Sequence, residues 1–164
     1  MFAIIEKISN IVMRWAAKLF PVSAGAVLTI SGFAKLISAG GGARILQNTD
    51  PIFGMRFRYV FLFVATIELI IAGVCFFGKR PGIQNGSVAW ISSSFLSYRI
   101  GLFMVGYHKP CQCLGNLTDA LHVSPQAADT AMKIVLAYLL IGSYSSLFWL
   151  WRQGKKTTRP AIVQ

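Results

Sequence analysis

Acidic side chains are scarce in this sequence. Its 164 residues contain 5 Asp and Glu against 16 Lys and Arg, and charged residues of both signs make up only 13% of the chain. Soluble domains average about 25% charged residues. With 55% hydrophobic residues and a mean hydropathy of +0.60, the composition argues against a soluble domain and indicates one domain solvated by a lipid bilayer.

Cysteine is scarce as well, since the chain has only 3. That number is too small for a disulfide scaffold. The net charge of +11 raises the question of nucleic-acid binding, but the basic residues are not gathered in one stripe, as such binding would require. They lie mostly at the ends of apolar runs, where they fix membrane topology and contact anionic lipid headgroups. We therefore expect a lipid bilayer as a partner and no nucleic acid.

Four apolar runs of about twenty residues are long enough to cross the hydrocarbon core. They comprise residues 20–39, 59–77, 87–107 and 131–151. Asp50-Pro51 and the Lys79-to-Gly82 connection mark turns, while Ser124 and Pro125 suit the N-cap and first position of the last helix. The sequence predicts an all-α fold, with a four-helix transmembrane bundle over residues 20–151 and a basic cytoplasmic tail over residues 152–164.

Residues 1–19 form a separate segment that is too charged to be a span. Its polar residues and its apolar residues recur three or four positions apart, on opposite helical faces. The polar set is Asn10, Lys7, Arg14 and Lys18, and the apolar set is Ile5, Ile8, Val12, Trp15 and Leu19. This pattern predicts an N-terminal amphipathic helix in the membrane interface. The alternative is a cytosolic extension of the first span.

The basic residues beside the apolar runs predict the orientation. Four crossings place both termini on one side of the membrane. If that side is cytoplasmic, nine basic residues flank the inner surface: Lys7, Arg14, Lys18, Lys79, Arg80, Arg152, Lys155, Lys156 and Arg159. Five flank the outer surface: Arg44, Arg56, Arg58, Lys109 and Lys133. The positive-inside rule then predicts a multi-pass protein of the inner membrane with cytoplasmic termini and a periplasmic segment 108–130, in a compartment where disulfides persist.

Three of the apolar runs carry an ionisable residue away from their ends, namely Lys35, Glu68 and Arg99. At a rise of ~1.5 Å per residue, Glu68 and Arg99 lie ~14 and ~12 Å below the outer ends of their runs, and Lys35 lies ~6 Å deep. Small residues share a stripe with Lys35 and with Glu68, as suits close helix packing. The small residues are Gly25, Thr29 and Gly32 in the first run, and Ala65, Ala72 and Cys75 in the second.

The matching depths predict an inward polar cluster of Lys35, Glu68 and Arg99, in which Glu68 contacts one or both cations. Two roles remain open for this cluster. One is a polar pocket for a quinone headgroup or a proton relay, and the other is a buried ion pair that fixes helix packing. Cys75 lies near the inner end of its run, too far from the other cysteines to bridge them, and is expected to be a small packing residue.

Cys111 and Cys113 form a Cys-x-Cys pair between the turn formers Pro110 and Gly115. A bent backbone brings such a pair within disulfide range, and the small ring strains the bond and makes it more oxidising. His108 and Lys109 beside it would favour the reactive thiolate. A static disulfide is one alternative. The other is a metal site of His108, Cys111, Cys113 and His122, although zinc knuckles separate their cysteines by two to four residues.

Three motifs in this order resemble the MauE/DoxX family of redox-associated membrane proteins. They are Gly32-Phe33-Ala34-Lys35-Leu36, Glu68-Leu69 and Cys111-Gln112-Cys113-Leu114-Gly115. The resemblance covers most of residues 20–151 and implies that Lys35, Glu68, Cys111 and Cys113 matter for function. It also implies disulfide maturation of a periplasmic dehydrogenase subunit, as in the methylamine-utilisation branch, or quinone-linked sulfur oxidation, as in the DoxX branch. The basic termini, the amphipathic leader and Cys75 are outside the family pattern.

The residues and the resemblance together predict thiol–disulfide exchange with an exported protein through Cys111 and Cys113. As an enzyme the chain would be a thiol–disulfide oxidoreductase, and quinone is the candidate electron acceptor. We expect no resident metal. The alternatives are a non-catalytic assembly factor or chaperone, and a metal carrier with His and Cys ligands.

Overall fold

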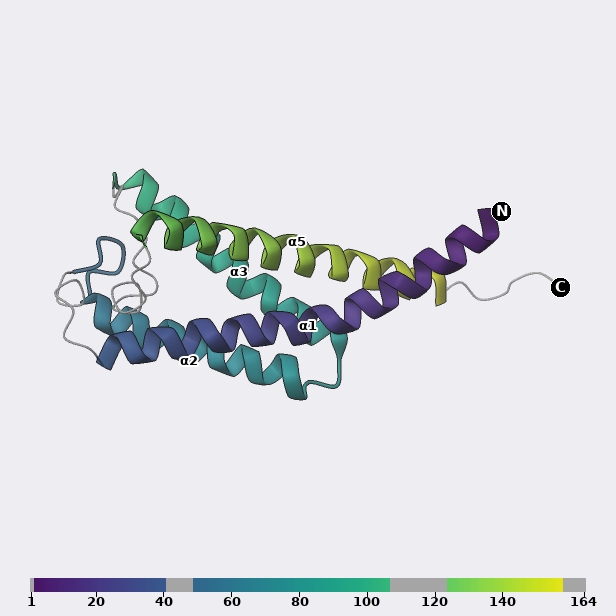
Figure 1. The fold of residues 1–164 in the computed structure, drawn as a ribbon, viewed down its shortest axis with the longest axis horizontal. Coiled ribbons are helices and arrows are strands. Elements are labelled where there is room, and N and C mark those ends of the chain that lie inside the picture. The colour runs from purple at the N-terminus through teal and green to yellow at the C-terminus, as the bar shows by residue number, and fades with distance from the viewer. Residues whose placement is uncertain (1, 41–48, 107–123, 158–164) are drawn as a thin grey trace.

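The computed structural model describes the backbone of residues 2–40, 49–106 and 124–157 (Figure 1), and the side chains of these residues except 2–16, 125, 154, 156 and 157. Within these ranges the chain forms four helices: α1 (Phe2–Gly40), α2 (Phe57–Phe77), α3 (Pro81–Met104) and α5 (Pro125–Thr157). An isolated bridge joins Thr49 to Arg56, and the described residues include no strand. The all-α prediction is therefore confirmed for this part of the chain.

Successive described helices run in opposite directions (Figure 1). The most extensive contacts are those of α1 with α2 and of α3 with α5. Contacts of α3 with α1 and α2, and of α1 with α5, join the two pairs. The start of α1 and the end of α5 lie at one end of the bundle, together with the connection between α2 and α3. The turn before α2, the end of α3 and the start of α5 lie at the opposite end, which we call the outer end.

Three of the described helices contain a segment that is long and apolar enough to cross a membrane. These segments are Ala17–Gly40, Phe57–Phe77 and Gln126–Gln153. The expected third span over residues 87–107 is helical as far as Met104, where α3 ends, but α3 does not belong to this set. It carries five serines and Arg99 within Pro81–Met104, which lowers its apolar character. The chain is a multi-pass membrane protein, and its described residues contain three such segments. The fourth predicted crossing stays a prediction.

The predicted boundary at residue 19 does not interrupt the helix, because α1 continues from Phe2 to Gly40. At ~1.5 Å per residue it is ~58 Å long, well beyond the ~30 Å of a hydrocarbon core. Pro21 lies inside it and withholds one backbone donor. A continuous helix agrees with the alternative given above, in which residues 1–19 extend the first span. The amphipathic pattern depends on side chains outside the described set, so it stays a prediction, as does the division into domains.

The ends of the helices follow the predicted local signals. α3 begins at Pro81, and the side chain of Gln84 donates to the carbonyl oxygens of Cys75 and Gly78 at 2.9 and 2.8 Å. These bonds satisfy acceptors at the end of α2. The hydroxyl of Ser124 accepts a bond from the amide of Ala127 at 3.3 Å, and α5 begins at Pro125. The predicted cap at Ser124 is therefore confirmed.

An apolar core fills the half of the bundle nearer the chain ends. Its buried residues come from all four helices: Phe20, Ala24, Leu28, Ile71, Ala72, Cys75, Val88, Ile91 and Leu139. Cys75 is 1% exposed and is a free thiol, which confirms the packing role expected for it. Glycines allow the helices to approach closely, as predicted for the stripe on α1. A Cβ at Gly25 would lie 3.0 Å from the Cβ of Cys75, and one at Gly32 would lie 3.1 Å from Leu69.

Candidate functional site

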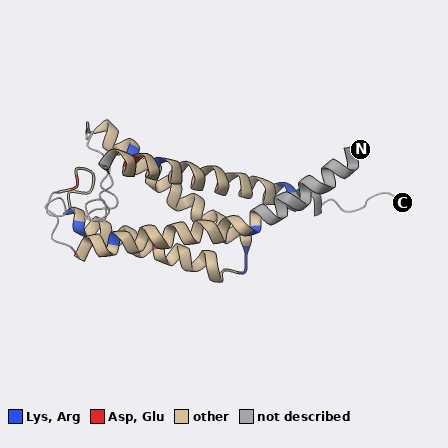
Figure 2. Ribbon diagram, in the orientation of Figure 1, with Lys and Arg blue, Asp and Glu red and all other residues tan. Residues whose placement is uncertain are grey.

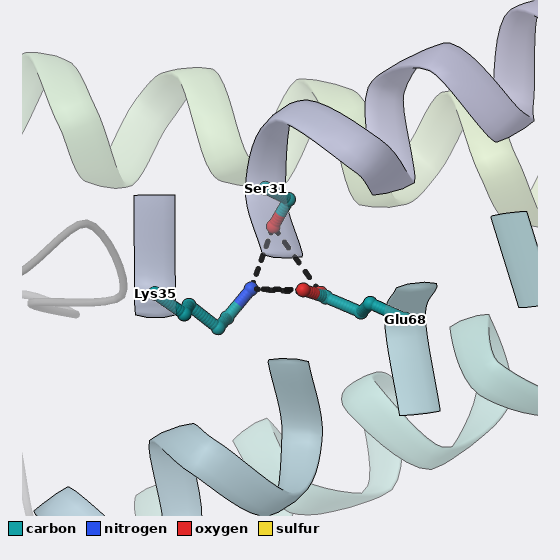
Figure 3. A network of polar contacts seen from close by, with 3 residues as sticks. All are labelled: Ser31, Lys35 and Glu68. Carbon is teal, nitrogen blue, oxygen red and sulfur yellow. Dashed lines mark hydrogen bonds and ion pairs between the residues drawn. The ribbon is translucent and has the colours of Figure 1, made fainter. Parts of the chain in front are cut away.

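A buried ion pair joins α1 to α2 in the outer half of the bundle (Figure 3). The ammonium nitrogen of Lys35 lies 2.7 Å from Oε1 and 2.9 Å from Oε2 of Glu68. It also donates to the hydroxyl oxygen of Ser31 at 2.6 Å, and Ser31 in turn donates to Oε1 of Glu68 at 3.2 Å. Ser31 precedes Lys35 by four residues, so one face of α1 presents both.

The side chains of Lys35 and Glu68 are only 7% and 1% exposed. An ammonium group has three donors, and all three are used here, by two carboxylate oxygens and one hydroxyl. The ring of Phe95 on α3 covers the same ammonium, with its centroid 5.7 Å away, an arrangement that favours a cation over the ring face. Within the described residues the pair is therefore closed: the lysine has no spare donor to offer a ligand.

Arg99, the third member of the predicted cluster, does not pair with Glu68. Its guanidinium binds Asp129 of α5 at 2.7 Å, and Lys133 binds the other oxygen of Asp129 at 2.7 Å. The prediction of a single cluster is wrong in this respect. Two physical reasons account for the error: α3 packs mainly against α5 rather than α2, and α5 begins at Pro125, which brings Asp129 onto the helix opposite Arg99.

A second buried carboxylate, that of Asp50, lies in the turn of residues 49–56 before α2. Asp50 is 0% exposed, and its Oδ1 accepts bonds from the amides of Ile52 and Phe53 at 2.8 and 2.9 Å. Its Oδ2 accepts a bond from the hydroxyl of Tyr98 on α3. The ring of Phe53 stacks on that of Tyr98, with centroids 5.8 Å apart. Asp50 therefore fastens the turn to α3.

The sequence identified Asp50-Pro51 only as a turn. An aspartate that begins a turn commonly accepts bonds from the amides that follow, so Oδ1 was foreseeable. The partner of Oδ2 was not, because Tyr98 is 48 residues away in the chain. Ser31 could have been found from its spacing to Lys35, since positions four apart share a helical face. Asp129 was missed because it precedes the apolar run that defined the last span.

The Cys-x-Cys pair and its neighbours His108, Lys109 and His122 lie outside the described residues. The end of α3 and the start of α5, which precede and follow that segment in the chain, are both at the outer end of the bundle (Figure 1). No group of three or more His, Cys, Asp or Glu side chains in residues 2–40, 49–106 and 124–157 is arranged to hold a metal ion. The metal alternative concerns residues outside these ranges and stays open.

One comparison with known protein families gives a match that includes most of the residues discussed above. The family model of the methylamine utilisation protein MauE matches residues 13–152. That range runs from α1 to the last turns of α5 and includes Lys35, Glu68, Cys111 and Cys113. No curated protein and no solved structure matches the chain.

Proposed function

The chain belongs to the MauE family of methylamine utilisation proteins, and we propose that it exchanges thiols and disulfides with an exported protein through Cys111 and Cys113. The observation that supports this most is a Cys-x-Cys pair inside the family match. In the chain, the pair lies between α3 and α5, and the end of α3 and the start of α5 both lie at the outer end of the bundle (Figure 1).

The proposed exchange moves two electrons and two protons. A thiolate of the exported protein attacks one sulfur of the Cys111–Cys113 disulfide, and a mixed disulfide forms as the other cysteine leaves as a thiolate. A second thiolate of the exported protein then attacks the mixed disulfide. The products are an oxidised partner and two reduced cysteines. The reverse sequence reduces a partner disulfide. In the oxidising direction a membrane quinone would accept the two electrons and two protons that restore the Cys111–Cys113 disulfide.

The membrane arrangement proposed for this reaction has α3 as a fourth crossing in the inner membrane, with cytoplasmic termini. The serines of α3 support a crossing by this helix, because three of their hydroxyls form hydrogen bonds within the helix. Those of Ser92, Ser93 and Ser94 donate to the carbonyl four residues earlier at 2.7, 2.8 and 2.9 Å. A helix whose hydroxyls are bonded to its own backbone carries less of the desolvation penalty of a polar segment in lipid.

For Lys35 and Glu68 we propose a structural role, in which the ion pair holds α1 against α2. Two roles were open for these residues: a pocket for a quinone headgroup or proton relay, or an ion pair that fixes helix packing. The closed bonding of Lys35, with its donors used by Glu68 and Ser31, favours the second, since a ligand would first have to break one of these bonds.

The experiment that tests the function is a double substitution, Cys111→Ser with Cys113→Ser, in cells that depend on the protein. Disulfide formation in the exported methylamine-utilisation proteins is followed by gel mobility after thiol alkylation. We expect the double variant to leave them reduced while the variant Cys75→Ser, which changes a thiol in the core, supports normal oxidation. Full oxidation in the double variant would instead indicate an assembly factor. A metal that remains bound to the purified wild type and is lost from the double variant would indicate a carrier.

A further inference from the structure

The last turns of α5 carry a ladder of two aromatic rings and two cations on one helical face. We call Phe148, Trp151, Arg152 and Lys155 the α5 ladder. The rings of Phe148 and Trp151 stack, with centroids 6.2 Å apart. Arg152 lies over Phe148 at 4.8 Å, and the ammonium of Lys155 lies over Trp151 at 3.7 Å. The spacings of three, four and seven residues place all four on the same face.

The cations of the ladder have no carboxylate partner among the described side chains. The ion pairs of those side chains are Lys35–Glu68, Arg99–Asp129 and Lys133–Asp129. The acidic positions, red on the ribbon of Figure 2, all lie toward the outer end, away from the end of α5. The connection between α2 and α3, at the ladder's end of the bundle (Figure 1), adds two exposed cations, Lys79 and Arg80. Among the side chains that the structure describes, the positive charge around the ladder is therefore not compensated.

The ladder coincides with the edge of the membrane-crossing segment. That segment of α5 ends at Gln153, so the rings occupy its last apolar turns and Lys155 lies just beyond it. Aromatic rings favour the boundary between hydrocarbon and headgroups, and cations next to that boundary reach the phosphate layer. Phe148 and Trp151 are 54% and 56% exposed, which leaves apolar surface for an acyl chain directly beneath two phosphate donors.

We propose that the α5 ladder is a binding site for an anionic phospholipid. Arg152 and Lys155 bind the phosphodiester, the arginine with two donors in a fork that suits phosphate oxygens, and the rings contact the adjoining acyl chain. A free phosphate ion could bind the same two cations, but it has no apolar part to contact the rings. The exposed rings therefore favour the lipid as occupant. This inference does not depend on the cysteines or on which leaflet the ladder faces.

The test is a lipid titration of the whole protein, purified in a neutral detergent. Phosphatidylglycerol and phosphatidylcholine with the same acyl chains are added separately, and bound lipid is measured by native mass spectrometry. The variant Arg152→Gln/Lys155→Gln removes the ladder's cations. Its matched control is Arg56→Gln/Arg58→Gln, which removes two exposed cations from the outer end and changes the net charge equally. A third arm repeats the phosphatidylglycerol titration with excess inorganic phosphate at constant ionic strength.

We expect wild type to bind phosphatidylglycerol more tightly than phosphatidylcholine. The ladder variant should lose about fivefold in that preference for each cation removed, as for a basic residue at an anionic surface, and the control should keep the preference. Inorganic phosphate should leave it unchanged. Equal affinity of wild type for both lipids would overturn the proposal. So would equal losses in both double variants, which would reflect net charge alone, or complete competition by inorganic phosphate, which would identify a phosphate site.

Discussion

Lys35 on α1 and Glu68 on α2, separated by 33 residues in the chain, meet in the outer half of the bundle, with the ammonium 2.7 and 2.9 Å from the two carboxylate oxygens. Each group alone would be a buried charge in a bilayer protein. Together with Ser31 they form a closed network that joins the two helices. The stability of the bundle should depend on keeping both members or removing both.

Replacing Glu68 with alanine leaves the Lys35 ammonium without its carboxylate. We expect the free energy of unfolding to fall by about 3–5 kcal/mol, the usual result of removing one partner of a buried pair. The matched variant Lys35→Met/Glu68→Leu removes both charges and keeps the volume, so it should remain close to wild type. Chemical unfolding in detergent measures both. If Glu68→Ala is as stable as wild type, the pair does not stabilise the bundle.

Tyr98 should hold the turn of residues 49–56 through its hydroxyl. Tyr98→Phe keeps the ring that stacks on Phe53 but leaves Oδ2 of the buried Asp50 without its Tyr98 donor, so stability should fall by about 1–3 kcal/mol. Hydrogen exchange at the amides of Asp50 and of residues 52–55 should also become faster. The control is Tyr59→Phe, at an exposed tyrosine of α2. Unchanged exchange in Tyr98→Phe would show that the turn is held by other contacts.

The contact between α1 and α5 should not tolerate a methyl group at Gly142. A Cβ at this position would overlap the ring of Phe20, whereas one at Gly73 would meet nothing within 4 Å. Gly142→Ala should therefore destabilise the protein by about 1–3 kcal/mol through overpacking. Gly73→Ala should be neutral or slightly stabilising, because alanine is the better helix former. Melting temperatures of the two variants, compared in one detergent, provide the measurement. A stabilised Gly142→Ala variant would contradict the packing of Phe20 on α5.

The proposed orientation predicts which thiols a membrane-impermeant reagent reaches. In intact, reduced cells it should label Cys111 and Cys113, because nine basic residues flank the proposed inner side against five outside. The buried Cys75 should react only after unfolding. A cysteine in place of Lys155, in a chain otherwise free of cysteine, should react only after the cells are permeabilised. Labelling of that cysteine in intact cells would reverse the assigned topology.

The sequence located the Lys35–Glu68 pair for a physical reason: ionisable residues in apolar runs are costly to bury alone, and helix rise converts residue number into depth. Small residues on the same stripes indicated which faces meet. Depth alone could not identify the ion-pair partner of Arg99, because the depth of a residue does not indicate which neighbouring helix it faces. Asp129 and Tyr98 acquire their partners from tertiary packing, which no local pattern encodes. The serines of α3 likewise make its apolar character weaker than its length suggested.

The most direct test of the proposed function is the redox titration of Cys111 and Cys113. Purified protein is equilibrated against graded glutathione and dithiothreitol buffers, and free thiols are trapped and counted. A single-residue spacing forces a small, strained ring, so we predict a reversible disulfide with a midpoint well above roughly −300 mV, the upper range of inert structural disulfides. A bond that stays closed throughout a mildly reducing series, or two thiols that never pair, would contradict the account.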